Sequence, residues 1–295
     1  MTIFQTRALS AAIFGIVMLI GLFWNEWSFK ILFSIVMAGC AWEFLNLTLE
    51  KGILRRVLGF GFCVAIYLSL GLISSMINNV TSLNLTLGKI VRILAVLPFV
   101  IVPILSLSEL FQKSEKPFQN VAMVFLTIFY ISIPFFFLLT PTLTSMRKGF
   151  QADDILDTNA AGFTPRIVAG MLFLTWANDT FAYIIGSRIG KNPLFARISP
   201  KKTWEGTIGG GLMCMVTAGI VSLFFKELNT LNWVVVGGII AIFGTLGDLV
   251  ESMLKRSVGV KDSGTIMPGH GGFLDRFDAF VFCIPFVYAY LLVIG

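Results

Sequence analysis

Apolar runs of about 20 residues recur along the whole chain, with short polar stretches between them. Each run is long enough to cross a hydrocarbon core of about 30 Å as a helix. A soluble helical core would need polar residues at helical period, and most of these runs have none. Nine spans are predicted, at residues 8–24, 29–49, 57–77, 90–111, 119–140, 166–186, 206–225, 232–252 and 276–294.

The predicted fold class is therefore an all-α, polytopic integral membrane protein with about nine transmembrane helices. Residues 1–140 form an N-terminal region of about five spans, and residues 141–295 a C-terminal region of about four spans with cytoplasmic loops. The run after Arg7 lacks a small-residue cleavage site, so we expect a retained first span rather than a signal peptide. The tryptophans expected at membrane interfaces are Trp24, Trp27, Trp204 and Trp233.

Composition supports this class. Of the 295 residues, 56% are hydrophobic and 13% are charged, whereas soluble domains carry about 25% charged residues. The net charge of +6 need not indicate nucleic acid, because no basic run alternates with aromatic residues as in single-strand binders. The four cysteines lie inside apolar runs without metal-ligand spacing and are predicted to be small buried hydrophobes: Cys40, Cys63, Cys214 and Cys283.

Charge also predicts orientation. If the N-terminus is cytoplasmic, most of the 22 Lys and Arg residues lie on the inner side, which the positive-inside rule favours. The excess comes from segments 187–205 and 253–276, whose basic residues are also candidate phosphate ligands. The 141–165 loop contains Asp153, Asp154 and Asp157 without the spacing of a calcium loop, so a solvated acidic loop on the outer face is expected.

Four carboxylates beside or within the spans are candidate functional groups, because an ionised side chain in hydrocarbon is costly. They are Asp179, Asp248, Asp275 and Asp278. With the predicted topology, all four collect at the inner membrane face. Helical spacing further places Asp248, Ser252 and Lys255 on one face of their span.

A glycine-rich segment at residues 259–272 separates the last two spans and contains Lys261, Asp262 and the run Pro-Gly-His-Gly-Gly at 268–272. Glycines permit close backbone approach, and successive amides can bind an anion. Taken singly, a carboxylate at a span end is often only interfacial, and His270, the only histidine, is more often a hydrogen-bonding loop residue. Together, hard oxygen ligands for Mg²⁺ and cationic side chains favour phosphoryl or nucleotidyl transfer.

The same residues carry a family resemblance. The runs Ser-Met-Leu-Lys-Arg at 252–256, Lys-Asp-Ser-Gly at 261–264 and His-Gly-Gly-Phe-Leu-Asp-Arg-Phe-Asp at 270–278 closely resemble the signature of the phosphatidate cytidylyltransferase family, also called CDP-diacylglycerol synthases. Residues 178–183, 198–206 and 247–249 agree with it, whereas Met267 stands where the family favours Leu, Ile or Phe. The resemblance covers about the last 120 residues, and the first five spans match only in hydropathy.

The resemblance implies an all-helical membrane enzyme that converts CTP and phosphatidic acid into CDP-diacylglycerol and pyrophosphate. It implies dependence on Mg²⁺, leaving open whether a monovalent cation also binds. It further implies a homodimer among membrane lipids, in a bacterial inner membrane with the active site facing the cytoplasm. The phosphate of phosphatidic acid is already an anionic nucleophile, so no protein nucleophile is needed.

Carried onto this chain, the resemblance assigns roles to charged and polar residues of the C-terminal region. The expected catalytic residues are Asp248, Asp275, Asp278, Lys255, Arg256 and His270. The expected metal ligands are Asp248, Asp275 and Asp179. The expected substrate-binding residues are Asn178, Asp179, Ser199, Lys201, Lys202, Ser252, Lys261, Asp262, Gly271, Gly272 and Arg276.

Three alternatives remain open. A membrane kinase that uses CTP to phosphorylate a polyisoprenol or phytol would release CDP instead of pyrophosphate. A transporter would place paired carboxylates near the bilayer midplane and show repeated halves, and neither feature is evident in the sequence. An alcohol phosphotransferase that acts on CDP-lipids would carry a DGxxAR…GxxxDxxxD motif, which is absent.

Overall fold

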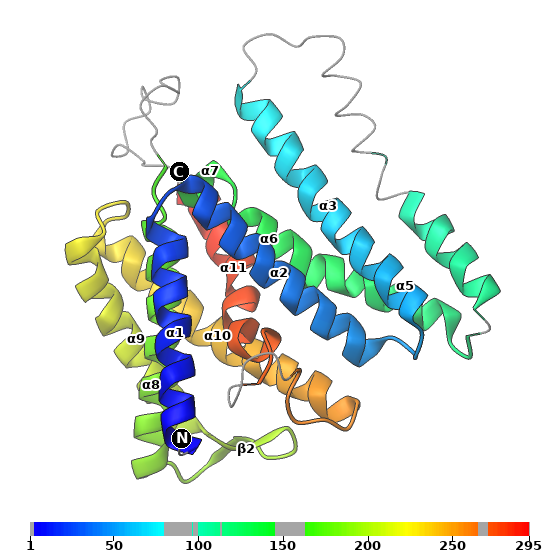
Figure 1. Cartoon of the computed structure of the whole chain (residues 1–295). Helices are drawn as coiled ribbons and strands as arrows, with labels where there is room; N and C mark the ends of the chain where they lie inside the picture. The colour runs from blue at the N-terminus through cyan, green and yellow to red at the C-terminus, as the bar shows by residue number, and fades with distance from the viewer. Residues whose placement is uncertain are drawn as a thin grey trace.

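A computed structural model describes residues 3–79, 96, 100–112, 114–144, 163–264 and 271–294. Helices account for almost all of these residues (Figure 1). They are α1 (Ile3–Phe23), α2 (Glu26–Thr48), α3 (Ile53–Asn79), an unlabelled helix (Val100–Phe111), α5 (Pro117–Thr127), η1 (Ile128–Ser132), α6 (Ile133–Phe137), α7 (Pro141–Thr144), α8 (Arg166–Ile189), α9 (Trp204–Phe224), α10 (Thr230–Ser257) and α11 (Leu274–Ile294). His270, Met267 and the three carboxylates of the 141–165 loop lie outside the described residues.

Seven of the described helical segments are long and apolar enough to span a membrane. They are Glu26–Thr48, Ile53–Ser74, Pro117–Phe137, Arg166–Ile189, Trp204–Phe224, Thr230–Ser257 and Leu274–Ile294. The all-α, polytopic membrane fold is thereby confirmed. The predicted spans 8–24 and 90–111 correspond in part to the shorter apolar helices Ala12–Phe23 and Val100–Phe111, so the described residues do not confirm the count of nine. The division at residue 140 stays a prediction.

The outer face of α9 shows why the bundle suits a membrane. Ile208, Leu212, Val216 and Ile220 recur every four residues and are each 53–58% exposed. A soluble protein would rarely leave so continuous an apolar face uncovered. The described bundle is therefore an integral membrane protein whose outer surface is covered by lipid.

Polar side chains fix where several of the helices begin. Asn25 and Ser28 form a capping box at α2, with Ser28 N donating to Asn25 Oδ1 at 2.8 Å. Thr203 Oγ1 accepts from Gly206 N at 3.2 Å at the start of α9. Asn229 Oδ1 accepts from Asn232 N at 2.8 Å at the start of α10. Each cap satisfies a backbone donor that would otherwise lack a partner at the membrane boundary.

Small residues let the helices of the C-terminal region pack at backbone distance. A Cβ on Gly210 of α9 would lie 2.7 Å from Ala182 Cβ of α8. A Cβ on Gly247 of α10 would lie 2.5 Å from Phe282 Cβ and 3.0 Å from the carbonyl oxygen of Asp278 in α11. Such close approach is typical of membrane helix interfaces. It fixes α8, α9, α10 and α11 relative to one another and so determines where their carboxylates lie.

Of the four tryptophans predicted to lie at membrane interfaces, three are on the surface of the bundle and one is buried. Trp24, Trp27 and Trp204 are 75%, 71% and 52% exposed, whereas Trp233 is fully buried. Its indole packs on Gly170, where a Cβ would collide with the ring, and its Nε1 donates to Phe225 O at 2.9 Å. Trp233 lies inside the bundle because a glycine on α8 leaves a space for it and a helix-end carbonyl accepts its N–H.

A hairpin occupies most of the 187–205 stretch that the sequence identified only as polar. Strands β1 (Pro193–Phe195) and β2 (Ser199–Thr203) pair antiparallel, with Pro193 opposite Thr203. Its base is closed by Glu205, which accepts from Lys191 N at 3.1 Å and from Asn192 Nδ2 at 2.7 Å. Strands of three and five residues containing proline carry no clear alternation of apolar and polar positions, so sequence pattern does not predict them.

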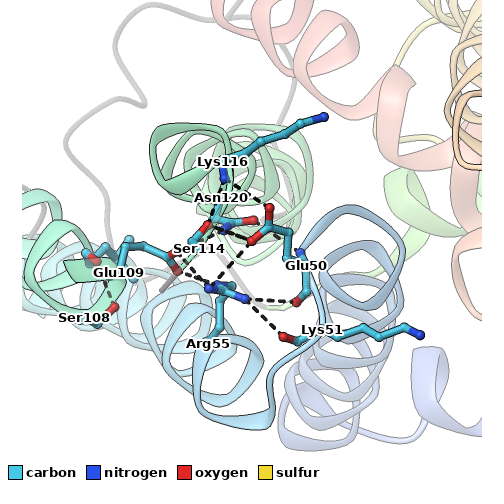
Figure 2. A network of polar contacts seen from close by, with 9 residues as sticks. Glu50, Lys51, Arg55, Ser108, Glu109, Ser114, Lys116 and Asn120 are labelled. Carbon is cyan, nitrogen blue, oxygen red and sulfur yellow. Dashed lines mark hydrogen bonds and ion pairs between the residues drawn. The ribbon is translucent and has the colours of Figure 1, made fainter. Parts of the chain in front are cut away.

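A buried polar network joins helices of the N-terminal region (Figure 2). Arg55, in the first turn of α3, donates from Nε to Glu109 Oε1 at 2.5 Å and from Nη2 to Glu109 Oε2 at 3.0 Å. Each residue of this two-pronged pair is only 5% exposed. Asn120 of α5 donates from Nδ2 to Glu109 Oε2 at 3.0 Å. The network thus connects α3, the helix Val100–Phe111 and α5.

Glu50, in the connection between α2 and α3, extends the same network. Its Oε2 accepts from Ser114 Oγ at 2.7 Å and its Oε1 accepts from Lys116 N at 3.1 Å. The Ser114 hydrogen bond is the main cause that lowers the pKa of Glu50 below its ordinary value. The connection between α2 and α3 is therefore tied to the connection that precedes α5, outside the apolar spans.

Replacing Arg55 with Ala should destabilise the protein by about 3–5 kcal/mol, because it leaves Glu109 as an uncompensated buried charge. Thermal unfolding of the purified protein in detergent measures the effect. The matched control is Lys30→Ala, which removes an exposed pair with Glu26 (2.6 Å) and should cost less than about 1 kcal/mol. Equal melting temperatures for the two variants would contradict a structural role for the network.

Candidate active site

Several polar elements meet at one end of the bundle (Figure 1). The N-terminus of α1, the β-hairpin and the C-terminal end of α10 lie toward the bottom of the view, and the chain's C-terminus lies at the top. The N-terminal end of α11 faces the C-terminal end of α10, since α11 follows α10 in the chain and packs against it. This end contains nearly all the residues predicted to act on phosphates.

Asp248 of α10 connects that helix to the hairpin. Its Oδ2 lies 2.6 Å from Lys202 Nζ in β2, and its Oδ1 accepts from Ser252 Oγ at 3.2 Å. The Asp248 and Lys202 side chains are both partly exposed. The predicted shared face of Asp248 and Ser252 is confirmed, and Lys202 is brought to the same place from a different element.

Lys255, one turn after Glu251, connects α10 to α11. Its Nζ forms an ion pair with Glu251 Oε2 and donates to Asp275 Oδ1 at 2.6 Å. Glu251 is almost fully buried, and neither of its carboxylate oxygens accepts a hydrogen bond of good geometry from the described residues. The short ion pair with Lys255 is therefore the compensation that the structure provides for the Glu251 charge.

Asp275 organises the glycine-rich segment around the start of α11. Its Oδ2 accepts from Ser263 N at 2.8 Å, from Ser263 Oγ at 3.0 Å and from Gly272 N at 2.8 Å. Its Oδ1 accepts only from Lys255 among the described residues. A carboxylate oxygen has two lone pairs, so Oδ1 keeps one that a cation or another donor could use.

Asp278 and Asp179 complete the group from two further positions. Asp278 lies one turn after Asp275, and its carboxylate interacts electrostatically with Asp248, Glu251 and Asp179. Asp179 of α8 is exposed at its surface and interacts with Asp248 and Lys202. The prediction that these aspartates of three helices collect at one end of the bundle is therefore met by the structure.

Glycines shape the two ends of the segment that joins α10 to α11. Gly259 has φ +73° and ends α10, with its N–H donating to Arg256 O at 3.2 Å. Gly271 has φ +84°, and a Cβ there would lie 2.6 Å from Asp275 Oδ2. A side chain at Gly271 would therefore be strained and would also displace the carboxylate.

Most of the other predicted site residues lie on the surface of the same end. The exposed ones are Lys201, Arg256, Lys261, Asp262 and Arg276, and Ser199 is partly exposed in β2. Arg256 also donates from Nη1 to Val260 O at 3.2 Å. Asn178 is instead buried, and its Oδ1 has no hydrogen-bond partner among the described residues. Cationic side chains are thus exposed at the same end of the bundle as the carboxylates.

Sequence reasoning missed three residues of this group: Glu43, Glu251 and Ser263. Glu43 of α2 is 3% exposed and accepts from Ser263 Oγ at 2.8 Å. Glu43 is also a carboxylate inside an apolar run. The argument that identified the aspartates as functional candidates therefore applied to Glu43 as well. Glu251 lies between Asp248 and Lys255 and shares their helix. Ser263 stands within the motif at 261–264 without an assigned role.

The donor set fits a hard cation in its chemistry. Five carboxylates gather here, namely Asp179, Asp248, Glu251, Asp275 and Asp278, while Lys202 and Lys255 are the ammonium groups paired with them. Clustered carboxylates in excess over the cations paired with them are stabilised by a metal ion with oxygen ligands, such as Mg²⁺. No three acidic, Cys or His groups of the described residues form a ready metal-binding group, so binding requires side-chain rotation.

Comparison with known proteins adds an independent finding. Residues 5–294 match the model of the cytidylyltransferase family. The chain is 35% identical over 218 residues to the phosphatidate cytidylyltransferase of Staphylococcus aureus (strain COL), which covers 73% of this chain and 76% of that protein. It is 55% identical over 114 residues to the phosphatidate cytidylyltransferase of Staphylococcus haemolyticus (strain JCSC1435), covering 38% and 44%.

Replacing Gly272 with Ala should destabilise the protein by about 1–3 kcal/mol, because the new Cβ would collide with Glu43 Oε2 and Ser263 Oγ. Thermal unfolding in detergent provides the measurement. The control is Gly61→Ala in α3, where nothing lies within 4 Å of the added Cβ and the better helix propensity of Ala gives up to about 1 kcal/mol. A Gly272→Ala protein as stable as wild type would contradict the packing described around Glu43.

Proposed function

The chain belongs to the cytidylyltransferase family, and from this premise we infer that it is a phosphatidate cytidylyltransferase. It transfers the CMP group of CTP onto phosphatidic acid and thereby makes CDP-diacylglycerol and pyrophosphate for phospholipid synthesis. The observation that carries the inference is the gathering of carboxylates from α8, α10 and α11 beside Lys202 and Lys255, at one end of a membrane-spanning bundle.

The reaction joins two anions, and charge repulsion is its main obstacle. An oxygen of the phosphatidic acid phosphate attacks the α-phosphorus of CTP, and the bond from that phosphorus to the bridging oxygen of the β-phosphate breaks. The electron pair leaves with pyrophosphate, so no protein nucleophile and no oxidant take part. Catalysis of this type consists of positioning and neutralising charge.

The exposed cations supply part of that neutralisation. We propose that Lys201, Arg256, Lys261 and Arg276 bind the triphosphate or the lipid phosphate, because they are exposed at the same end of the bundle as the carboxylates. Lys202 is held by Asp248 at 2.6 Å, which orients its ammonium group toward the same place. Asn178, Ser199, Ser252, Asp262 and the amides of Gly271 and Gly272 remain proposed substrate contacts.

We propose that Asp248, Asp275 and Asp278 hold Mg²⁺, with Asp179 as a further ligand. When bound, the ion supplies positive charge to the triphosphate oxygens and to the leaving pyrophosphate. Asp275 suits this role through the remaining lone pair of Oδ1, while its Oδ2 keeps the loop in place. Whether a monovalent cation binds as well is a separate question that metal titration answers.

A site at the end of the spans also suits the two substrates. The phosphate of phosphatidic acid lies at the membrane surface while its acyl chains stay in hydrocarbon, and CTP arrives from water. We propose that this end faces the cytoplasm of a bacterial inner membrane, as the distribution of Lys and Arg favours. We further propose a homodimer, for which the family resemblance is the support.

A labelled-substrate assay tests the function. Purified protein is incubated with α-³²P-CTP, phosphatidic acid and Mg²⁺, and the labelled product is identified. We expect the label in a lipid that co-migrates with CDP-diacylglycerol, together with release of pyrophosphate, and no product after chelation with EDTA. Label remaining in free CDP would contradict the transferase and favour the lipid kinase instead.

Replacing Asp275 with Asn should lower the rate of cytidylyl transfer by at least about 100-fold, because a charged ligand and the partner of Lys255 are lost together. Insertion into the membrane should be unchanged, since the amide is isosteric. The same assay, normalised to folded protein, measures the effect. The control is Glu26→Gln at the start of α2, an exposed carboxylate at the other end of the bundle. Near-normal activity of Asp275→Asn would refute the metal assignment.

A further inference from the structure

We propose that Glu43 of α2 is a positioning residue for the reaction, which holds the start of α11 and, through Ser263, the carboxylate of Asp275. This inference rests on the proposed function, because it gives the site a residue from the N-terminal region. From the sequence pattern, that region is predicted to contribute only membrane spans. The contacts of Glu43 connect it directly to the catalytic end.

Glu43 accepts three hydrogen bonds from a segment more than 200 residues later in the chain. Its Oε1 accepts from Phe273 N at 3.0 Å. Its Oε2 accepts from Leu274 N at 2.9 Å and from Ser263 Oγ at 2.8 Å. Phe273 and Leu274 lie at the N-terminus of α11, where backbone N–H groups have no partner within the helix. Glu43 therefore caps α11 from a neighbouring helix.

The Ser263 hydroxyl lies between two carboxylates. Its Oγ is 2.8 Å from Glu43 Oε2 and 3.0 Å from Asp275 Oδ2. One hydroxyl has one proton, so Ser263 donates to one of these oxygens at a time. The position of Asp275 is thus coupled to that of Glu43 through a single side chain.

The packing around Glu43 allows little movement. Cβ atoms on Gly264 and Gly272 would each collide with its carboxylate. One turn earlier on α2, a Cβ on Gly39 would lie 2.5 Å from the Phe273 ring. Glycine at all three positions is what lets α2, the 263–264 turn and α11 approach this closely.

The charge of Glu43 is balanced without a cation among the described residues. It is 3% exposed, and no described Lys or Arg lies within ion-pair distance of it. A buried carboxylate of this kind depends on its hydrogen bonds and on the positive end of a helix dipole. Those donors belong to α11 and Ser263. Loss of the Glu43 charge should therefore weaken the contacts that hold the segment carrying Asp275 in place.

Glu43→Gln tests the proposal with little change of shape. An amide has one accepting oxygen, so its NH₂ group would face a backbone N–H of Phe273 or Leu274, which also donates. We expect kcat for cytidylyl transfer, per folded protein, to fall by about 10–100-fold, as for groups that orient metal ligands. The KM for CTP should stay within about threefold, since the exposed cations are unchanged.

Hydrogen exchange provides a measure that does not need activity. In Glu43→Gln, the amides of residues 271–276 should exchange at least about tenfold faster than in wild type. The matched control is Glu227→Gln, another buried carboxylate that accepts from Arg166 at 3.0 Å and lies at the opposite end of the bundle, between α9 and α10. Glu227→Gln should change kcat and the hydrogen-exchange rates of residues 271–276 by no more than about twofold relative to wild type.

A double-mutant cycle tests the route through Ser263. Ser263→Ala alone should lower kcat, and the Glu43→Gln/Ser263→Ala protein should lose less than the product of the two single losses. Fully multiplicative losses would overturn the coupling. If Glu43→Gln does not fold, the hydrogen-exchange rates and the kcat of Ser263→Ala provide the same test.

The outcomes separate this inference from the proposed function. If wild-type protein makes no CDP-diacylglycerol, the function fails, and faster exchange in Glu43→Gln still supports the positioning of α11. If wild type is active and Glu43→Gln retains both its kcat and its exchange rates, the inference is overturned and the function stands.

Discussion

The junction between Glu43, Ser263 and Asp275 is the constraint on which the catalytic end depends. Two carboxylates, one from α2 and one from the first turn of α11, share the Ser263 hydroxyl and accept the backbone N–H groups of residues 272–274. Burial keeps water from most of these donors, so carboxylates of the protein satisfy them. The junction therefore fixes three parts relative to one another: α2, the segment that follows α10, and α11 itself. This arrangement determines where Asp275 and Asp278 lie.

Around that junction the carboxylates outnumber the ammonium groups that form ion pairs with them. Lys202 pairs with Asp248, and Lys255 pairs with both Glu251 and Asp275, while Asp179 and Asp278 have no ion pair of their own among the described residues. In the proposed mechanism, a divalent cation would stabilise these carboxylates, and the exposed Lys and Arg side chains would stabilise the phosphates. The gathering of carboxylates beside cationic side chains is therefore the property that suits this end of the bundle to the proposed nucleotidyl transfer.

Patterns within single segments of the sequence correctly predicted features that depend on those segments alone. Hydropathy predicted the spans from α8 to α11, and helical spacing placed Asp248 beside Ser252. The pairing of Glu43 with residues more than 200 positions later could not be predicted, because periodicity within one helix says nothing about which helix packs against it. The same limit applies to Trp233, whose burial depends on Gly170 of another helix. The hairpin was missed because its strands are too short to show alternation.

We propose that Asp248, Asp275 and Asp278 hold a catalytic cation at the end of the bundle. Anomalous diffraction from crystals grown with Mn²⁺ and CTP tests it most directly, since Mn²⁺ replaces Mg²⁺ and is located by its own scattering. We expect one strong peak within coordination distance of at least two of these three carboxylates, with the triphosphate beside it. A peak elsewhere, or a bound triphosphate with no cation at these carboxylates, would contradict it.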